Sequence, residues 1–246
     1  MICGFIFVAS LTIFSGCGED EILVIPPPTV QNPDTTGTDS LSIPDRILTY
    51  LALGDSYTIG TGVPAEERFP VQLFNRLTDA DFDMLTPHII ATNGWTTGNL
   101  INATNNFEPD SIFDLVSLLI GVNNQFQGRS IEEYTDEFDQ LLRKALTYTG
   151  DDTSQVIVIS IPDYGVTPFG QSMNPAEIAQ EIDAFNGVNQ SITEAYGISY
   201  FYITDISRQA ATNPALIAGD NLHPSGAQYS LWLDVMEETI KLKLYE

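Results

Sequence analysis

Residues 47–57 read Ile-Leu-Thr-Tyr-Leu-Ala-Leu-Gly-Asp-Ser-Tyr, a continuous apolar run that ends in a small polar turn. An apolar run without polar alternation is typical of a parallel strand that is buried on both faces. Ligands of open parallel sheets bind at the carboxyl ends of the strands. A serine in a tight turn at that end projects its Oγ above the sheet, which makes Ser56 a candidate nucleophile. Taken alone, an Asp-Ser pair is equally typical of an ordinary turn or helix N-cap.

The rest of the chain repeats this pattern of buried runs separated by amphipathic segments. Four further apolar runs occupy residues 88–92, 113–120, 155–161 and 199–203. Helical patterns occupy residues 66–77, 131–148, 174–196 and 224–244, and Ser130 and Asn174 are the expected N-caps of the second and third. Strands that alternate with helices predict a doubly wound, three-layer α/β/α fold around a parallel sheet of about five strands.

Three more polar clusters occupy positions where a cleft is expected. Gly94 follows the second apolar run, and a glycine there lets a backbone N–H approach a ligand closely, although a plain glycine turn is the alternative. Asn123 follows the third run and offers an amide donor, or else satisfies turn backbone groups. His223 lies three residues after Asp220 in a loop, a spacing that allows the carboxylate to orient the imidazole as a general base. His88 begins a strand at the opposite end of the sheet and is expected to be structural.

Taken in chain order, these segments resemble the four sequence blocks of the GDSL or SGNH hydrolase superfamily. The matching segments are GDSY (54–57), the glycine of NGW (93–95), GVNN (121–124) and DNLHP (220–224). The resemblance implies a flavodoxin-like SGNH fold and a cofactor-free serine esterase. It also implies that Ser56 is the nucleophile, that Gly94 and Asn123 complete an oxyanion hole with the Ser56 N–H, and that His223 is the base oriented by Asp220. Because a general base must be unprotonated, we expect the activity to decline in acid.

The chain departs from the family pattern at two positions next to these residues. Tyr57 replaces the usual Leu, and Asn124 stands where the family often has Asp. We expect residues 125–128 and 162–165 to form the substrate rim, with Tyr57, Trp95 and Phe126 as possible stacking groups. O-acetylated carbohydrates, lysophospholipids and other small acyl esters all remain open as substrates.

The N-terminal 46 residues have the composition of an export and tethering segment. Residues 2–16 are apolar and uncharged, which is typical of a signal peptide and too short to span a bilayer. The residues that end at Cys17 resemble a bacterial lipobox, so lipidation of Cys17 is expected. Residues 18–46 are rich in Pro, Thr and Asp and predict a flexible tether ahead of a hydrolase domain at residues 47–246. The acidic residues 19–21 resemble a surface-export signal, and we expect an exported lipoprotein of the cell envelope that contacts the membrane only through its lipid.

Composition excludes several other classes of protein. With 9 Lys and Arg against 33 Asp and Glu, the formal net charge of -24 opposes nucleic-acid binding. Both cysteines lie at positions 3 and 17, and only two histidines are present, so we expect no metal site in the domain. We also expect a monomer.

Two rival functions remain at this point. One is a catalytically silent surface lipoprotein that binds glycan or lipid in the same crevice. The other is a flavodoxin-like carrier, which would need a phosphate cradle where this chain has only the short turn at residues 54–57.

Overall fold

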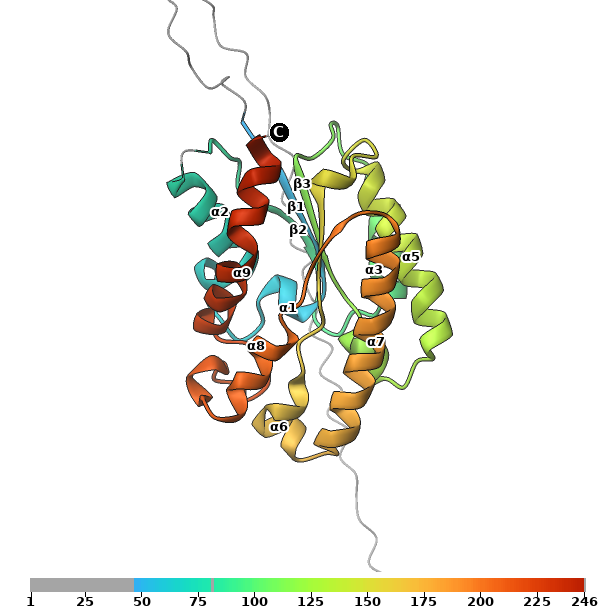
Figure 1. Cartoon of the computed structure of the whole chain (residues 1–246), viewed down its shortest axis with the longest axis vertical. Helices are drawn as coiled ribbons and strands as arrows, with labels where there is room; N and C mark the ends of the chain where they lie inside the picture. Colours follow the sequence, from blue (N-terminus) through green and yellow to red (C-terminus); the bar gives the residue numbers. More distant parts are fainter. Residues whose placement is uncertain (1–46, 81, 246) are drawn as a thin grey trace, which may run out of the picture.

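The computed structural model describes residues 47–80 and 82–245, and it shows a single parallel sheet (Figure 1). The strands are β1 (Tyr50–Gly54), β2 (His88–Ala91), β3 (Leu115–Leu119), β4 (Val156–Ile159) and β5 (Ser199–Phe201). Their order across the sheet is β2-β1-β3-β4-β5, and every neighbouring pair is parallel. The predicted five-stranded parallel sheet is therefore confirmed.

Helices cover both faces of this sheet, as the predicted three-layer architecture requires. Figure 1 shows one layer on each side of the strands. One layer contains α2 (Phe69–Asp79) and α9 (Gly226–Tyr245), and the other contains α3 (Thr97–Asn105), α5 (Ile131–Thr147) and α7 (Pro175–Ala195).

Short helices occupy the loops between these elements. The α-helical turns are α1 (Ser56–Ile59), α4 (Val122–Phe126), α6 (Pro168–Gln171) and α8 (Thr204–Arg208). The 3₁₀ turns are η1 (Ala65–Glu67), η2 (Thr153–Gln155), η3 (Tyr164–Val166), η4 (Gln209–Ala211) and η5 (Pro214–Leu216).

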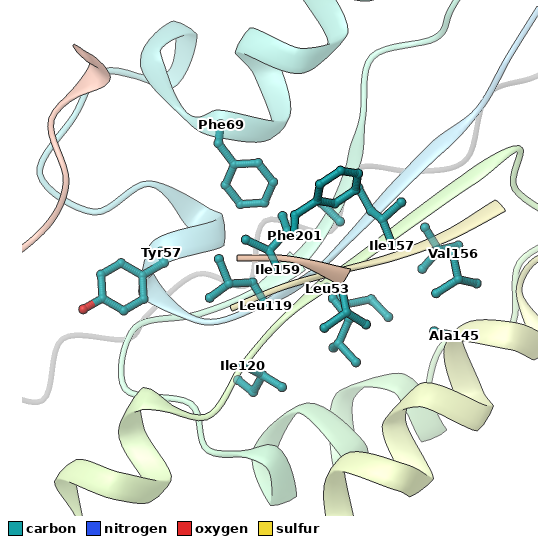
Figure 2. Close-up of a cluster of buried hydrophobic side chains, with 14 of the residues drawn as sticks. Leu53, Tyr57, Phe69, Leu119, Ile120, Ala145, Val156, Ile157, Ile159 and Phe201 are labelled. Atoms are coloured by element: carbon teal, nitrogen blue, oxygen red, sulfur yellow. The ribbon is translucent and has the colours of Figure 1, made fainter. Parts of the chain in front are cut away.

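The hydrophobic core lies on both faces of the strands, which explains why their sequences show no polar alternation. Every residue of β1, β3 and β4 is buried. Figure 2 shows strand side chains such as Leu53 and Ile159 packed with Phe69 from α2 and Ala145 from α5. Burial on both faces removes these side chains from water and holds the strand ends in a fixed register.

The expected helix starts are correct in part. The Ser130 Oγ accepts the Glu133 N–H at 3.1 Å, as predicted for an N-cap. Asn174 does occupy the N-cap position of α7, but its side chain does not cap the backbone and instead donates to the Glu177 carboxylate at 2.9 Å. The helix expected over residues 66–77 begins three residues later, at Phe69, because Arg68 is extended and follows the η1 turn.

Candidate active site

The β1–α1 turn holds Ser56 at the carboxyl end of a central strand. Asp55 caps the single turn of α1, with its Oδ1 accepting the Tyr57 N–H at 3.0 Å. Gly60 ends the helix in a left-handed conformation at φ 75°. Gly54 has no room for a side chain, since a Cβ would lie 2.5 Å from the Leu119 carbonyl oxygen. The turn is thus confined by its neighbours, and Ser56 remains 7% exposed.

Asp220 and His223 form a hydrogen-bonded pair in the loop before α9. The His223 Nδ1 lies 2.6 Å from the Asp220 Oδ2, while the Asp220 Oδ1 accepts the N–H groups of Leu222 and His223 at 3.0 Å each. Partial burial acts to raise the pKa of Asp220, but these hydrogen bonds outweigh it and hold the pKa below its ordinary value. The carboxylate is therefore charged and orients the ring through Nδ1, which leaves Nε2 as the nitrogen available to a reacting group.

Ser56 and His223 line the same pocket, although they are 167 positions apart along the chain. This pocket has a volume of about 100 Å³. Its other lining residues are Tyr57, Val122, Asn123, Phe126, Tyr164, Phe169 and Leu222. Tyr57 also packs edge-on against the His223 ring, with centroids 5.7 Å apart. A hydroxyl, an oriented imidazole and an amide thus converge on one small, largely aromatic cavity.

The two predicted oxyanion-hole residues other than Ser56 differ in their position relative to the pocket. Asn123 lines the pocket and donates one Nδ2 hydrogen to the Trp95 carbonyl at 3.0 Å, so its second amide hydrogen remains for a ligand. Gly94 does not line the pocket. It lies in the adjoining turn at φ 76°, with open space beside its Cα, and its carbonyl accepts a long 3.5 Å hydrogen bond from Gln127.

A buried network joins the turn that carries Gly94 to the helix that carries Asn123. The Asn124 Oδ1 accepts the Thr97 N–H at 2.9 Å, and the Asn124 amide donates to the Thr97 hydroxyl at 2.5 Å. That hydroxyl in turn donates to the Glu137 carboxylate on α5. Asn124 and Thr97 are fully buried. Sequence reasoning noted Asn124 only as a departure from the family pattern and missed both partners, because nothing in a linear pattern pairs residues 97, 124 and 137.

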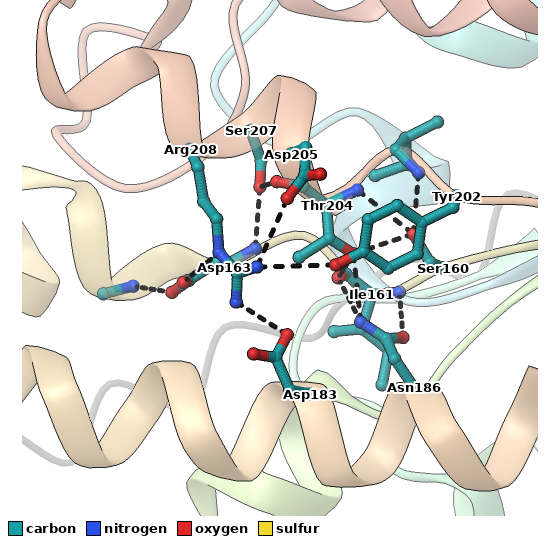
Figure 3. A network of polar contacts seen from close by, with 12 residues as sticks. Ser160, Ile161, Asp163, Asp183, Asn186, Tyr202, Thr204, Asp205, Ser207 and Arg208 are labelled. Atoms are coloured by element: carbon teal, nitrogen blue, oxygen red, sulfur yellow. Dashed lines mark hydrogen bonds and ion pairs between the residues drawn. The ribbon is translucent and has the colours of Figure 1, made fainter.

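The rim of the pocket is fixed by a second polar network. Figure 3 shows Arg208 of α8 reaching the carboxylate of Asp163, with Nε to Oδ2 at 3.0 Å. Asp163 is almost fully buried, its N–H donates to the Ser207 hydroxyl, and its Oδ1 caps the turn that carries Tyr164. The expected rim segments at 125–128 and 162–165 do supply Phe126 and Tyr164.

Two further rim residues were not named from the sequence. Phe169 lies in the one-turn helix α6, and Leu222 lies between Asp220 and His223 in the segment at 220–224. Trp95, expected as a stacking group of the rim, does not line this pocket and contacts it through its backbone carbonyl, which accepts the Asn123 amide. It lines a different cavity together with His88, which stacks on Phe107 at 4.7 Å and belongs to the packing around β2.

Asp55 is a buried carboxyl group next to the candidate nucleophile. Its side chain is 0% exposed, and its Oδ2 has no hydrogen-bond partner within residues 47–80 and 82–245. Burial raises the pKa of Asp55 to about 7, although the Tyr57 N–H opposes this shift. Burial thus favours the neutral, protonated form of Asp55.

Within the described residues, no group of three or more His, Cys, Asp or Glu side chains is arranged to hold a metal ion. Over the same part of the chain, no helix combines the length and apolar character needed to cross a membrane. Cys17, the predicted lipidation site, lies outside the described residues, as do the predicted signal peptide and tether.

The chain is similar in sequence to a family of known proteins. The profile of the GDSL-like Lipase/Acylhydrolase family matches residues 52–231. The chain belongs to this family. No match was found among curated protein sequences. A general ester hydrolase is the activity that the family membership supports.

Solved structures share the fold of this GDSL-family chain. A lipase/acylhydrolase from Enterococcus faecalis is 18% identical with a TM-score of 0.62, covering 80% of this chain and 97% of its own. The psychrotrophic esterase EstA from Pseudoalteromonas sp. is 20% identical with a TM-score of 0.58, covering 80% and 99%. A variant of the acetyl xylan esterase Axe2 from Geobacillus stearothermophilus is 19% identical with a TM-score of 0.58, covering 79% and 96%. At these identities the likeness establishes the fold.

Proposed function

We propose that this chain is a serine esterase that hydrolyses short acyl esters through an acyl-enzyme on Ser56. The observation that carries the proposal is the single pocket lined by Ser56, Asn123 and His223, with His223 held by Asp220 at 2.6 Å. Membership of the GDSL-like lipase/acylhydrolase family supports ester hydrolysis as the reaction class.

The reaction follows from these parts. The Ser56 Oγ attacks the ester carbonyl carbon while His223 accepts the hydroxyl proton, and the carbonyl oxygen becomes an oxyanion. Collapse of this intermediate breaks the bond to the alcohol, which leaves with the proton from His223. A water molecule then attacks the acyl-enzyme and gives a proton to His223. Collapse of this second intermediate breaks the bond to the Ser56 Oγ, which takes the proton back from His223 as the carboxylic acid is released.

Three donors are assigned to the oxyanion in this proposal. The Ser56 N–H belongs to the first turn of α1, where N–H groups have no partner inside the helix. The second donor is the remaining amide hydrogen of Asn123. The third is the N–H of Gly94, whose turn is tied to the site by the Asn123 bond to Trp95. Fixed donors that match the developing charge stabilise the transition state more than the substrate.

The small pocket favours a short acyl group. Its volume of about 100 Å³ lies below the range of roughly 300–1,000 Å³ that small-ligand sites occupy. Tyr164, Phe169 and Phe126 line it and pack against one another, so a long chain would have to extend past these aromatic side chains.

Hydrolysis of p-nitrophenyl esters of increasing chain length tests this function. We expect kcat/KM to be highest for acetate to butyrate and to fall steeply by decanoate, and Ser56→Ala to abolish turnover. Ser111→Ala, at an exposed serine outside the pocket, is the matched control and should retain full activity. Undiminished hydrolysis by Ser56→Ala would refute the proposal.

We further propose that the enzyme is exported and anchored through a lipid on Cys17. The support is the apolar, uncharged stretch at residues 2–16 and the Pro-rich, acidic segment that follows Cys17. Metabolic labelling of cells with a clickable fatty acid should tag the wild-type protein and leave Cys17→Ala untagged. Equal tagging of both proteins would argue against this anchor.

A further inference from the structure

A second and larger cavity lies along the outermost strand of the sheet, and we call it the β2 groove. It has a volume of about 430 Å³, within the range of roughly 300–1,000 Å³ that small-ligand sites occupy. The strand residues Ile89 and Ala91, together with Ala103 of α3, provide an apolar surface, and Trp95 and Phe107 add aromatic rings. Both residues are partly exposed; Trp95 is the candidate stacking surface, because one face of the Phe107 ring is already stacked on His88.

Three asparagines on α3 and at its end line the same groove. Asn99 uses its Oδ1 to accept from Thr96, and its amide hydrogens have no partner within the described chain. Asn102 makes no side-chain hydrogen bond with any described residue, and Asn106 uses its amide on the Asn102 carbonyl and keeps its Oδ1. The groove therefore presents unused amide donors and acceptors beside aromatic rings.

The lack of charged residues in the β2 groove favours a neutral ligand. No Lys, Arg, Asp or Glu of the described chain lines the β2 groove. An anionic ligand would find no counter-charge there and would meet the field of a chain with a net charge of -24. A neutral molecule with many hydroxyl groups on apolar rings matches both the amides and the aromatic faces, because hydroxyls can pair with amides while ring faces stack.

The groove adjoins the candidate active site through one residue. Trp95 lines the groove, and its backbone carbonyl accepts the Asn123 amide of the active-site pocket at 3.0 Å. A ligand stacked on Trp95 would thus lie beside the turn that carries Gly94. This position suits the alcohol portion of an ester better than the acyl portion, which the small pocket at Ser56 is shaped to hold.

We propose that the β2 groove binds a neutral sugar chain, the alcohol part of an acylated carbohydrate substrate. The inference rests on the proposed esterase function and names its substrate class. Trp95 provides the stacking surface, and Asn99, Asn102 and Asn106 pair with sugar hydroxyls. The groove is a binding site and takes no part in bond breaking.

Binding of xylotetraose to the full-length Ser56→Ala protein tests this inference without catalysis. Saturation-transfer NMR and calorimetry should detect a saturable interaction. Trp95→Ala should weaken it about tenfold and Asn102→Ala about threefold, whereas Phe169→Ala in the other pocket should leave it unchanged. Asn102 is exposed and lacks a structural hydrogen bond, so its variant keeps the test valid even where Trp95→Ala does not fold.

Several outcomes would overturn the inference. Equal sugar binding by all variants, or none by the parent protein, would place the sugar elsewhere. Displacement by decanoate would indicate an acyl-chain site, and self-association lost in Asn102→Ala would indicate a contact between copies of the chain. With Ser56 intact, Asn102→Ala should lose efficiency on acetylated xylan, whereas the control Ser111→Ala should not. If the protein hydrolyses p-nitrophenyl acetate through Ser56 but binds no sugar, the sugar-binding inference is wrong and the proposed esterase function stands.

Discussion

Asn123 has one amide hydrogen committed to Trp95 and one left for the substrate, so its side chain is already oriented before a ligand arrives. Replacing it with Ala removes an oxyanion donor, and such donors contribute on the order of a hundredfold or more to turnover. We predict that Asn123→Ala lowers kcat for p-nitrophenyl acetate by at least that factor and changes KM little. Steady-state kinetics measure both, and an unreduced kcat would exclude Asn123 from the oxyanion hole.

Asp55 gives a pH dependence that can be measured through stability. Its pKa is about 7 in the folded protein and about 4 in an unfolded chain, so the folded state binds this proton more tightly. The free energy of unfolding therefore falls as pH rises from about 4 to about 7. Above pH 7 it stays lower by this full amount. Asp55→Asn keeps the acceptor for the Tyr57 N–H and cannot ionise.

Thermal unfolding of wild type and Asp55→Asn at pH 5 and pH 8 measures this effect. We predict that the stability of Asp55→Asn relative to wild type improves between these values by a few kcal/mol. The esterase activity at pH 8 should survive in the Asn variant if it folds. A relative stability that does not change with pH would show that Asp55 is ionised at both values.

At the scale of elements, the active site depends on how α3 and α4 are joined. Thr97→Val keeps the shape of the side chain but removes the hydroxyl that bonds both Asn124 and Glu137. We predict a loss of about 1–3 kcal/mol in the free energy of unfolding, the usual cost of unpaired buried polar groups. We also predict a several-fold lower kcat with a smaller change in KM, since the turn carrying Gly94 would lose its register with Asn123. An equal loss of stability with unchanged kcat would make the network purely structural.

The elements that the sequence predicts well are those with long apolar runs. The strands β1, β3 and β4 were located because burial on both faces leaves no polar alternation, and Ser130 revealed the start of α5. The first strand begins at Tyr50, three residues after the apolar run begins, since Leu48 forms only an isolated bridge with Met84. The one-turn helices α1 and α4 have too few residues for a periodic pattern, although they carry Ser56 and Asn123.

Pairings within the site can be predicted from the sequence where the two residues lie close together in the chain. Asp220 and His223 are three residues apart, so their pairing could be inferred from a loop sequence. Phe169 and Arg208 act through tertiary contacts with segments distant in the chain, and no local pattern marks them. The separate cavity lined by Trp95 was likewise invisible, because it depends on how α3 packs beside β2.

At the scale of the whole molecule, the net charge of -24 should influence substrate encounter. Neither Lys nor Arg lines the described active-site pocket, so no local cation offsets this field. We predict that kcat/KM for an anionic ester, such as the p-nitrophenyl half-ester of succinate, rises several-fold between 10 and 200 mM NaCl. The value for the neutral p-nitrophenyl butyrate should stay nearly constant, and equal salt responses would argue against electrostatic steering.

Covalent labelling with a fluorophosphonate tests most directly whether the fold assembles a reactive serine with its base. Peptide mapping by mass spectrometry should find the adduct on Ser56, with labelling at least a hundredfold slower in His223→Ala and unchanged in His88→Ala. Absence of an adduct, or labelling of Ser56 at the same rate without His223, would contradict the account.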